Sequence, residues 1–150
     1  MVEKESEFGR RVIAAKQSPL YDNPADKERL DRYILVESPL KAYQQLAKWH
    51  RQGFNIPVIG LTGTNGKTTT VTLLHRMFTA LGYSCGLLST IANYVGNRGT
   101  EAVNTTSDPI TINSLLSEMV DAGCEYCFME ASSIGVEQER ITGLKFKAGI

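Results

Sequence analysis

A strand, a glycine-rich turn and a helix follow one another between Ile56 and Gly82, and this arrangement constrains the fold more than any other part of the sequence. The run IPVIGL is continuously apolar, which is typical of a strand buried on both faces. The turn TGTNG comes next, and the segment KTTTVTLLHRMFTALG has apolar residues at helical spacing. Three consecutive threonines, Thr68 to Thr70, are a poor start for a purely structural helix, because β-branched residues lose side-chain freedom there. The turn is therefore expected to hold a ligand that interacts with hydroxyl groups.

The composition of this turn predicts a loop that binds the phosphates of a nucleotide. Backbone N–H groups gather at a helix N-terminus, where the helix dipole attracts anions. Gly63 and Gly66 let the backbone approach an anion closely, and Lys67 supplies charge for the outer phosphates. Thr68 offers a hydroxyl to Mg²⁺. The generic pattern has glycine where this chain has Leu61, so TGTNGKT is a variant; a tight connection without a ligand is the alternative.

Strand-like and helix-like segments alternate along the rest of the chain. The expected strands cover residues 32–37, 56–61, 83–90, 124–131 and 144–150. The expected helices cover residues 38–53, 67–82 and 108–123. A hairpin is expected at residues 96–97, and a turn with a short helix at residues 132–143. The segments 10–16 and 25–32 could each form a helical turn or two, separated by a loop at 18–26. This alternation predicts an α/β fold, a mostly parallel sheet with flanking helices of the P-loop NTPase kind. Ligands in such sheets bind at the carboxyl ends of the strands.

Charge and cysteine usage exclude several classes of function. Sixteen basic residues balance sixteen acidic ones, which argues against a broad surface for nucleic acid or an anionic membrane. The charged start lacks the apolar core of a signal peptide, and no apolar run approaches the ~20 residues that span a bilayer, so the cytoplasm is the expected compartment. Cys124 and Cys127 form a Cys-x-x-Cys pair inside a strand-like run rather than at a helix start, which disfavours a redox or zinc site.

The motifs resemble those of the Mur ligase family, the ATP-dependent amide-forming ligases of peptidoglycan assembly. TGTNGKTTT has that family's form of phosphate loop, and GLLST, NTTSDP and FMEASSIGVEQERITGLKF follow in the order and spacing of its UDP-N-acetylmuramoyl-tripeptide synthetase branch. The resemblance implies that ATP phosphorylates a carboxylate of UDP-N-acetylmuramoyl-L-alanyl-D-glutamate. The amine of a third amino acid then attacks the acyl phosphate, giving an amide, ADP and phosphate. Such chemistry needs positioning and charge neutralisation more than protein nucleophiles.

The resemblance also implies roles for individual residues. The ATP loop would consist of Gly63, Thr64, Asn65, Gly66, Lys67, Thr68 and Thr69. Lys67 would contact the transferring phosphate, and Glu130 would help Thr68 to hold Mg²⁺; these two, Lys67 and Glu130, are the expected catalytic residues. The expected contacts to the UDP-muramoyl-dipeptide are Asn104, Thr105, Thr106, Ser132, Gln138 and Arg140. Alternatively, Glu130 caps the next turn, Arg140 is a solvated charge, and TTSDP is only a capped helix entry. Ile134 stands where many members have histidine, and Ser107 where many have proline.

The resemblance covers the chain unevenly. Residues 55–150 would form part of the central ATP-binding domain, and residues 1–54 an N-terminal segment with an unmatched start and the tail of a preceding domain. The chain is thus expected to be a truncated piece that binds ATP or phosphate with little turnover. It is expected to need the missing domains of a parent ligase for full activity. Exposed sheet edges are expected to let it self-associate. The alternatives are a ligase of the MurF or folylpolyglutamate type, a P-loop module without ligase chemistry, and a recombined or engineered fragment. The sequence does not indicate which amino acid is added.

Overall fold

The computed structural model describes residues 12–15, 33–50 and 56–150. Two compact units make up the chain, Met1–Gln45 and Leu46–Ile150. In the first unit the strands β1 (Val12–Ala15) and β2 (Tyr33–Val36) pair in parallel. Helix α4 (Pro39–His50) follows β2, and its N-terminus is capped by Ser38, whose Oγ accepts from the amide of Lys41 over 3.4 Å. The sequence-based boundary after residue 54 stays a prediction.

The strand β1 corrects one expectation from the sequence. The segment 10–16 was a candidate for a helical turn, but Val12–Ala15 is extended and matches Tyr33–Val36 residue for residue. Val12 and Ile13 are β-branched and suit a strand, and a parallel partner supplies the hydrogen bonds that four isolated residues lack. The other candidate helical turn, 25–32, and the loop at 18–26 lie outside the described residues.

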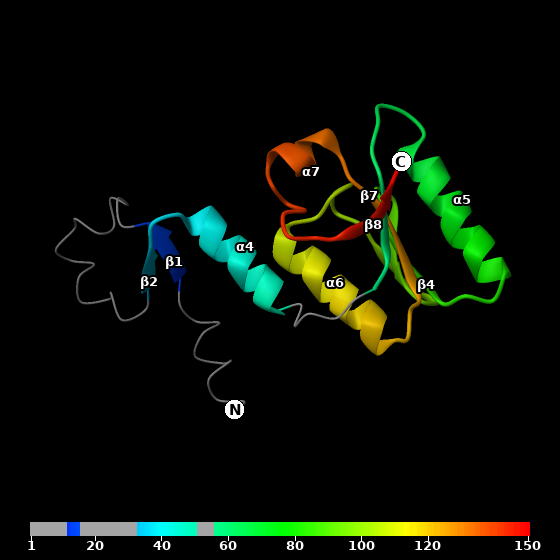
Figure 1. The fold of residues 1–150 in the computed structure, drawn as a ribbon, viewed down its shortest axis with the longest axis horizontal. Coiled ribbons are helices and arrows are strands. Elements are labelled where there is room, and N and C mark those ends of the chain that lie inside the picture. The colour runs from blue at the N-terminus through cyan, green and yellow to red at the C-terminus, as the bar shows by residue number, and fades with distance from the viewer. Residues whose placement is uncertain (1–11, 16–32, 51–55) are drawn as a thin grey trace. The chain divides into compact units, whose positions relative to one another are not determined.

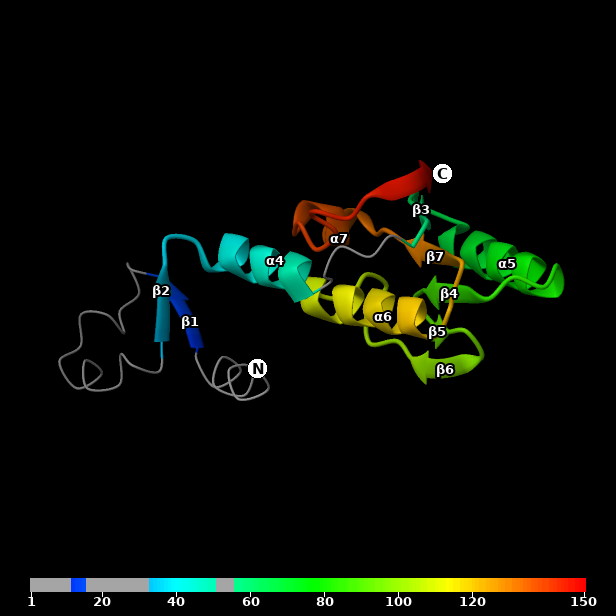
Figure 2. The ribbon, with the colours of Figure 1, turned by 60° about the horizontal axis from the view of Figure 1, so that its bottom comes forward.

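The second unit is built on a six-stranded sheet with the order β6-β5-β4-β7-β3-β8 (Figure 2). The strands are β3 (Val58–Leu61), β4 (Cys85–Leu88), β5 (Ala92–Val95), β6 (Arg98–Glu101), β7 (Tyr126–Glu130) and β8 (Phe146–Gly149). Four neighbours, β4, β7, β3 and β8, run parallel, and β5 and β6 add an antiparallel hairpin at one edge. The expectation of a mostly parallel sheet, with a hairpin at Gly96 and Asn97, is confirmed.

Helices cover both faces of this sheet (Figure 1). Helix α5 (Lys67–Ala80) places Val71 against Leu87 and Phe128 on one face. Helix α6 (Pro109–Asp121) places Ile112, Leu116 and Met119 on the other face, against a second set of strand side chains. Burying each large apolar side chain contributes about 1.5–3 kcal/mol, so the two cores hold the strand ends in fixed positions.

Helices α5 and α6 begin and end close to where the sequence predicts, whereas the predicted end of α4 at Gly53 lies outside the described residues. Asp108 caps α6, its carboxylate accepting from the amides of Ile110 and Thr111 over 3.0 and 3.1 Å, and Pro109 occupies the first turn. Gly82 follows α5 with a φ of 94°, a left-handed conformation that glycine adopts without strain. A short helix, α7 (Ser133–Glu137), follows β7.

The edge strand β8 is joined to β3 beyond the strand ends. Ile150 donates its amide to the Gly60 carbonyl over 2.9 Å, and its carbonyl accepts from the amide of Thr62 over 2.8 Å. Thr62 directly precedes Gly63, so these hydrogen bonds hold the backbone at the point where it leaves the sheet. The outer edge of β8 and the outer edge of β6 form the two ends of the sheet; the expected self-association through them stays a prediction.

Candidate nucleotide and metal site

The glycine-rich turn leaves the carboxyl end of β3 and leads directly into α5. Residues 62–66 are exposed, and Gly63 and Gly66 have φ values of 125° and 82°, which a side chain would strain. Gly66 occupies the N-cap position of α5, and no side chain hydrogen-bonds to the amides there. A helix start without a side-chain cap presents free N–H groups and the positive end of the helix dipole, the arrangement that binds phosphate.

The side chain of Lys67 lies over this turn. Its ammonium group donates to the carbonyl oxygen of Gly63 over 2.6 Å, which closes the turn into a loop. Lysine carries three donors on a flexible stem, so the ammonium group can contact both the loop and an anion inside it. The backbone from Gly63 to Lys67 is therefore curled into a closed loop, not extended.

A buried carboxylate lies next to the loop. Glu130 is the last residue of β7, is 0% exposed and is the register partner of Leu61 on β3. Its Oε2 accepts from the Thr68 hydroxyl over 3.0 Å, and its Oε1 accepts from the amide of Thr90 over 2.9 Å. The structure therefore brings Glu130 and Thr68 together, although 61 residues separate them in the sequence.

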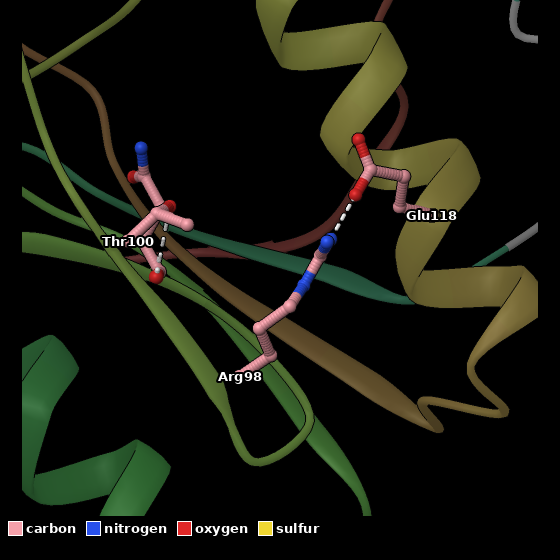
Figure 3. A network of polar contacts seen from close by, with 4 residues as sticks. Arg98, Thr100 and Glu118 are labelled. Atoms are coloured by element: carbon pink, nitrogen blue, oxygen red, sulfur yellow. Dashed lines mark hydrogen bonds and ion pairs between the residues drawn. The ribbon is translucent and has the colours of Figure 1, made fainter.

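The surroundings of Glu130 fit a divalent cation. Within the described part of the chain, only hydroxyl and amide donors contact this carboxylate, and no lysine, arginine or histidine forms an ion pair with it. A buried negative charge without a cationic partner is costly. Carboxylate and hydroxyl oxygens are the hard ligands that Mg²⁺ prefers, and it takes few of them from the protein when phosphates supply the rest. Arg98 and Glu118 pair elsewhere, on the exposed surface between β6 and α6 (Figure 3).

The residues expected to contact the muramoyl-dipeptide lie in two segments after the neighbouring strands. Thr106 is 2% exposed, and its hydroxyl donates to the Glu130 carbonyl over 3.0 Å and accepts from the amide of Ser132 over 2.9 Å. Arg140 donates from Nη1 to the Thr106 carbonyl over 2.7 Å. Thr106 thus links both segments to the backbone of Glu130.

The remaining expected contacts have different surroundings. Gln138 accepts two hydrogen bonds from Arg140 through its side-chain oxygen, over 2.9 and 2.6 Å, so the guanidinium is held at both ends. Ser132 caps α7, its hydroxyl accepting from the amide of Gly135 over 3.0 Å. Asn104 is exposed, and Thr105 is partly buried. Their assignment to a ligand stays a prediction.

Thr90 contacts Glu130 although its sequence did not mark it as a site residue. It follows β4, and besides its amide its hydroxyl lies 3.2 Å from Glu130 Oε2 and 3.1 Å from the Thr105 hydroxyl oxygen. Its position gave a usable signal, because it lies at the carboxyl end of a buried strand in a sheet where such positions meet at one edge. The motif GLLST pointed to the family but gave Thr90 no role of its own.

The three cysteines belong to the structural core. Cys85, Cys124 and Cys127 are free and buried. Burial raises the pKa of the Cys127 thiol, and likewise that of Cys85, which keeps both protonated and unreactive. In residues 12–15, 33–50 and 56–150 no group of three or more histidine, cysteine or acidic side chains is placed to hold a metal, so a Cys-rich metal site is absent from this part of the chain. No helix in those ranges is long and apolar enough to cross a bilayer.

The chain is similar in sequence to a known domain family and to several named ligases. The profile of the Mur ligase middle domain matches residues 61–150. A protein from Cytophaga hutchinsonii, named UDP-N-acetylmuramoyl-L-alanyl-D-glutamate--2,6-diaminopimelate ligase, is 54% identical over 144 residues, which is 95% of this chain and 29% of the relative. A protein of the same name from Phocaeicola vulgatus is 54% identical over 99% of this chain and 30% of its own length. Another, from Parabacteroides distasonis, is 41% identical over 96% of this chain and 29% of its own length.

A solved structure of a protein with this name has a similar fold. It superposes with a TM-score of 0.68 at 20% sequence identity, over 91% of this chain and 32% of that chain. The chain therefore spans about 30% of the length of the curated relatives it matches.

Proposed function

Because the chain belongs to the Mur ligase family through its middle domain, we propose that it forms the ATP-binding part of a ligase that extends UDP-N-acetylmuramoyl-L-alanyl-D-glutamate by one amino acid. The contact between the Thr68 hydroxyl and Glu130 Oε2, at 3.0 Å, carries this proposal. This contact joins the end of β7 to the start of α5, directly after the phosphate loop that follows β3. A Mg²⁺-nucleotide site needs a hydroxyl and a carboxylate held together beside the phosphates. The relatives' shared name indicates 2,6-diaminopimelate as the amino acid, and the cytoplasm is the proposed compartment.

Some residues of this chain would bind the phosphates of the nucleotide, and others would hold the metal. The amides from Gly63 to Thr69 and the ammonium of Lys67 would bind the phosphates, with Lys67 reaching the transferring group through the donors that the Gly63 carbonyl does not use. Thr68 and Glu130 would hold Mg²⁺, which neutralises charge during phosphoryl transfer. The amides at the start of α5 are fixed by the helix, so they need no rearrangement when a phosphate enters.

The second set of residues would hold the carboxylate substrate. Arg140 has a planar guanidinium that binds carboxylate or phosphate through two parallel hydrogen bonds. Gln138 and the Thr106 carbonyl orient that guanidinium, while Asn104, Thr105 and Ser132 lie on the segments beside Glu130. Thr106 bonds both to Arg140 and to the Glu130 carbonyl, so it links this guanidinium to the strand that ends beside the phosphate loop. An acyl phosphate can form only where the carboxylate and the phosphate are held together.

Calorimetry with Mg²⁺ and a non-hydrolysable ATP analogue tests the nucleotide part. The wild-type chain is expected to bind, and Lys67→Ala to bind at least tenfold more weakly, since a charged hydrogen bond contributes roughly 1.5–3 kcal/mol. Lys147→Ala, which removes an exposed lysine from β8, is the matched control and should bind as the wild type does. Equal affinities for wild type and Lys67→Ala would contradict the role of the loop.

Binding of UDP-N-acetylmuramoyl-L-alanyl-D-glutamate tests the substrate part. Wild-type chain is expected to bind it more tightly than Arg140→Ala does. Nucleotide binding without any response to this muramoyl-peptide would favour a P-loop module without ligase chemistry.

A further inference from the structure

The chain places Thr90 beside Glu130 through a short turn after β4. Leu88 is the register partner of Met129, so the residues that follow lie next to Glu130. The buried Ser89 fixes the turn, because its hydroxyl donates to the Ala92 carbonyl over 2.8 Å and accepts from the Ala92 amide over 3.3 Å. This turn points both the amide and the hydroxyl of Thr90 at the same carboxylate.

The Thr90 hydroxyl has more possible partners than protons. It lies 3.2 and 3.3 Å from the two oxygens of Glu130 and 3.1 Å from the hydroxyl oxygen of Thr105. A hydroxyl donates one proton, and hydrogen bonds to a charged acceptor are the stronger ones. Glu130 is therefore the favoured acceptor for Thr90, which leaves the Thr90 oxygen free to accept from the Thr105 hydroxyl instead of donating to it. In this arrangement the hydroxyl proton of Thr105 bonds to the Thr90 oxygen and is not available to a ligand.

The preference of the Thr90 hydroxyl for Glu130 would weaken if Thr68 and Glu130 held a cation, because the cation would reduce the negative charge that the carboxylate offers. The Thr90 amide would remain on Oε1 at 2.9 Å. The Thr90 hydroxyl would then be free to donate to Thr105. The Thr105 proton would in turn be free for an acceptor oxygen on a ligand, such as a carboxylate or a phosphate.

We propose that Thr90 is a positioning residue that relays occupation of the metal and nucleotide site to Thr105, so that the muramoyl-peptide binds more tightly once Mg²⁺-nucleotide is present; this rests on the proposed function. The relay requires the side-chain hydroxyl of Thr90, because the amide alone contacts only Glu130. The expected coupling is a two- to tenfold gain in peptide affinity, about the contribution of a single hydrogen bond.

Nuclear magnetic resonance of the 150-residue chain tests the relay with Mg²⁺ and a non-hydrolysable ATP analogue as the probe. In the wild type, the probe is expected to shift the methyl and amide resonances of Thr105. Thr90→Val keeps the amide and the shape of the side chain, so it should still bind the probe but lose the Thr105 shift. Thr90→Ser restores the hydroxyl and should restore the shift. Calorimetry of UDP-N-acetylmuramoyl-L-alanyl-D-glutamate, with and without the probe, should show the affinity gain in wild type and Thr90→Ser only.

Thr100→Val is the matched control. The Thr100 hydroxyl donates to the Asn93 carbonyl over 3.5 Å on the β5–β6 hairpin (Figure 3). Within the described residues, the hydrogen bonds to the Glu130 carboxylate come from Thr68 and Thr90 instead. This variant should behave as the wild type. If Thr90→Val is unstable, Thr105→Val removes the other end of the relay and should abolish the same affinity gain.

Three outcomes would overturn the inference. An unchanged Thr105 shift and affinity gain in Thr90→Val would refute the relay while leaving the proposed function intact. Complete loss of probe binding in Thr90→Val would show that Thr90 acts on nucleotide binding itself. Failure of the wild type to bind the probe would remove the proposed function, and the relay with it.

Discussion

Leu61 and Glu130 are parallel register partners at the carboxyl ends of β3 and β7. The phosphate loop therefore starts beside the carboxylate that would hold its metal, and the pairing of two strands fixes their separation. Neither residue needs a flexible loop to reach the other. A site anchored on two central strands is held more precisely than one carried by loops alone.

The left-handed conformation of Gly66 gives the first prediction. Gly66→Ala should destabilise the chain by about 1–2 kcal/mol, because an L side chain is strained at a φ of 82° even though a Cβ has open space there. Gly82→Ala, at a φ of 94° beyond the other end of α5, should cost a similar amount. Urea unfolding measures both losses. Only Gly66→Ala should also weaken binding of the ATP analogue, and a matching loss in Gly82→Ala would mean that the effect is global instability.

The charge of Glu130 gives the second prediction. Glu130→Gln keeps the size of the side chain and removes the negative charge, so it should lose tenfold or more of the gain in nucleotide affinity that Mg²⁺ provides, since a charged contact contributes roughly 1.5–3 kcal/mol. Binding in EDTA should change little. Calorimetry with and without Mg²⁺ measures the difference. Glu118→Gln, which affects only the exposed pair with Arg98, should keep the full Mg²⁺ effect; an undiminished Mg²⁺ effect in Glu130→Gln would contradict the metal assignment.

The buried hydroxyl of Thr106 gives the third prediction. Thr106→Val leaves the Glu130 carbonyl and the Ser132 amide without this partner, so the free energy of unfolding should fall by about 1–3 kcal/mol. Thr100→Val loses only a long hydrogen bond from the exposed edge strand β6 and should stay within about 0.5 kcal/mol of the wild type. Denaturant unfolding compares the two. Similar small losses in both variants would show that the Thr106 bridge does not contribute to stability.

The titration of His75 gives the fourth prediction. Burial lowers the pKa of this imidazole, which lies 5.4 Å from the Tyr94 ring, and its Nε2 is buried without a hydrogen-bond partner. The unfolded chain, with a histidine pKa of about 6.5, then binds the proton more readily than the folded chain does. Stability should therefore be complete above that pKa and should fall as the pH drops below it.

The variant His75→Gln should flatten this dependence. Urea unfolding at pH 7.5 and pH 5 measures the slope for both proteins. An equally steep loss of stability in His75→Gln would assign the pH dependence to other groups.

Much of the fold could be predicted because local signals agreed with the tertiary structure. Pro109 and Asp108 start α6, Gly82 follows α5, and the apolar run before Thr62 is a central parallel strand. The placement of Glu130 beside Thr68 also follows from elementary geometry, because adjacent parallel strands end at the same edge.

What could not be predicted depends on partners that are distant in the sequence. Val12–Ala15 is a strand because β2 pairs with it, and four residues carry too little pattern to reveal that. Thr90 is part of the site because β4 pairs with β7, which brings the turn that follows Leu88 next to Glu130. Lys67 rests on the Gly63 carbonyl, a contact that a motif does not encode.

The two hydrogen bonds of Ile150 have a practical consequence. They connect the backbone of Ile150 to Gly60 and Thr62, on either side of the step from β3 into the phosphate loop. A dye attached to a cysteine placed at position 150 would consequently lie beside the backbone that leads into Gly63. Its emission could report nucleotide entry without any label inside the loop.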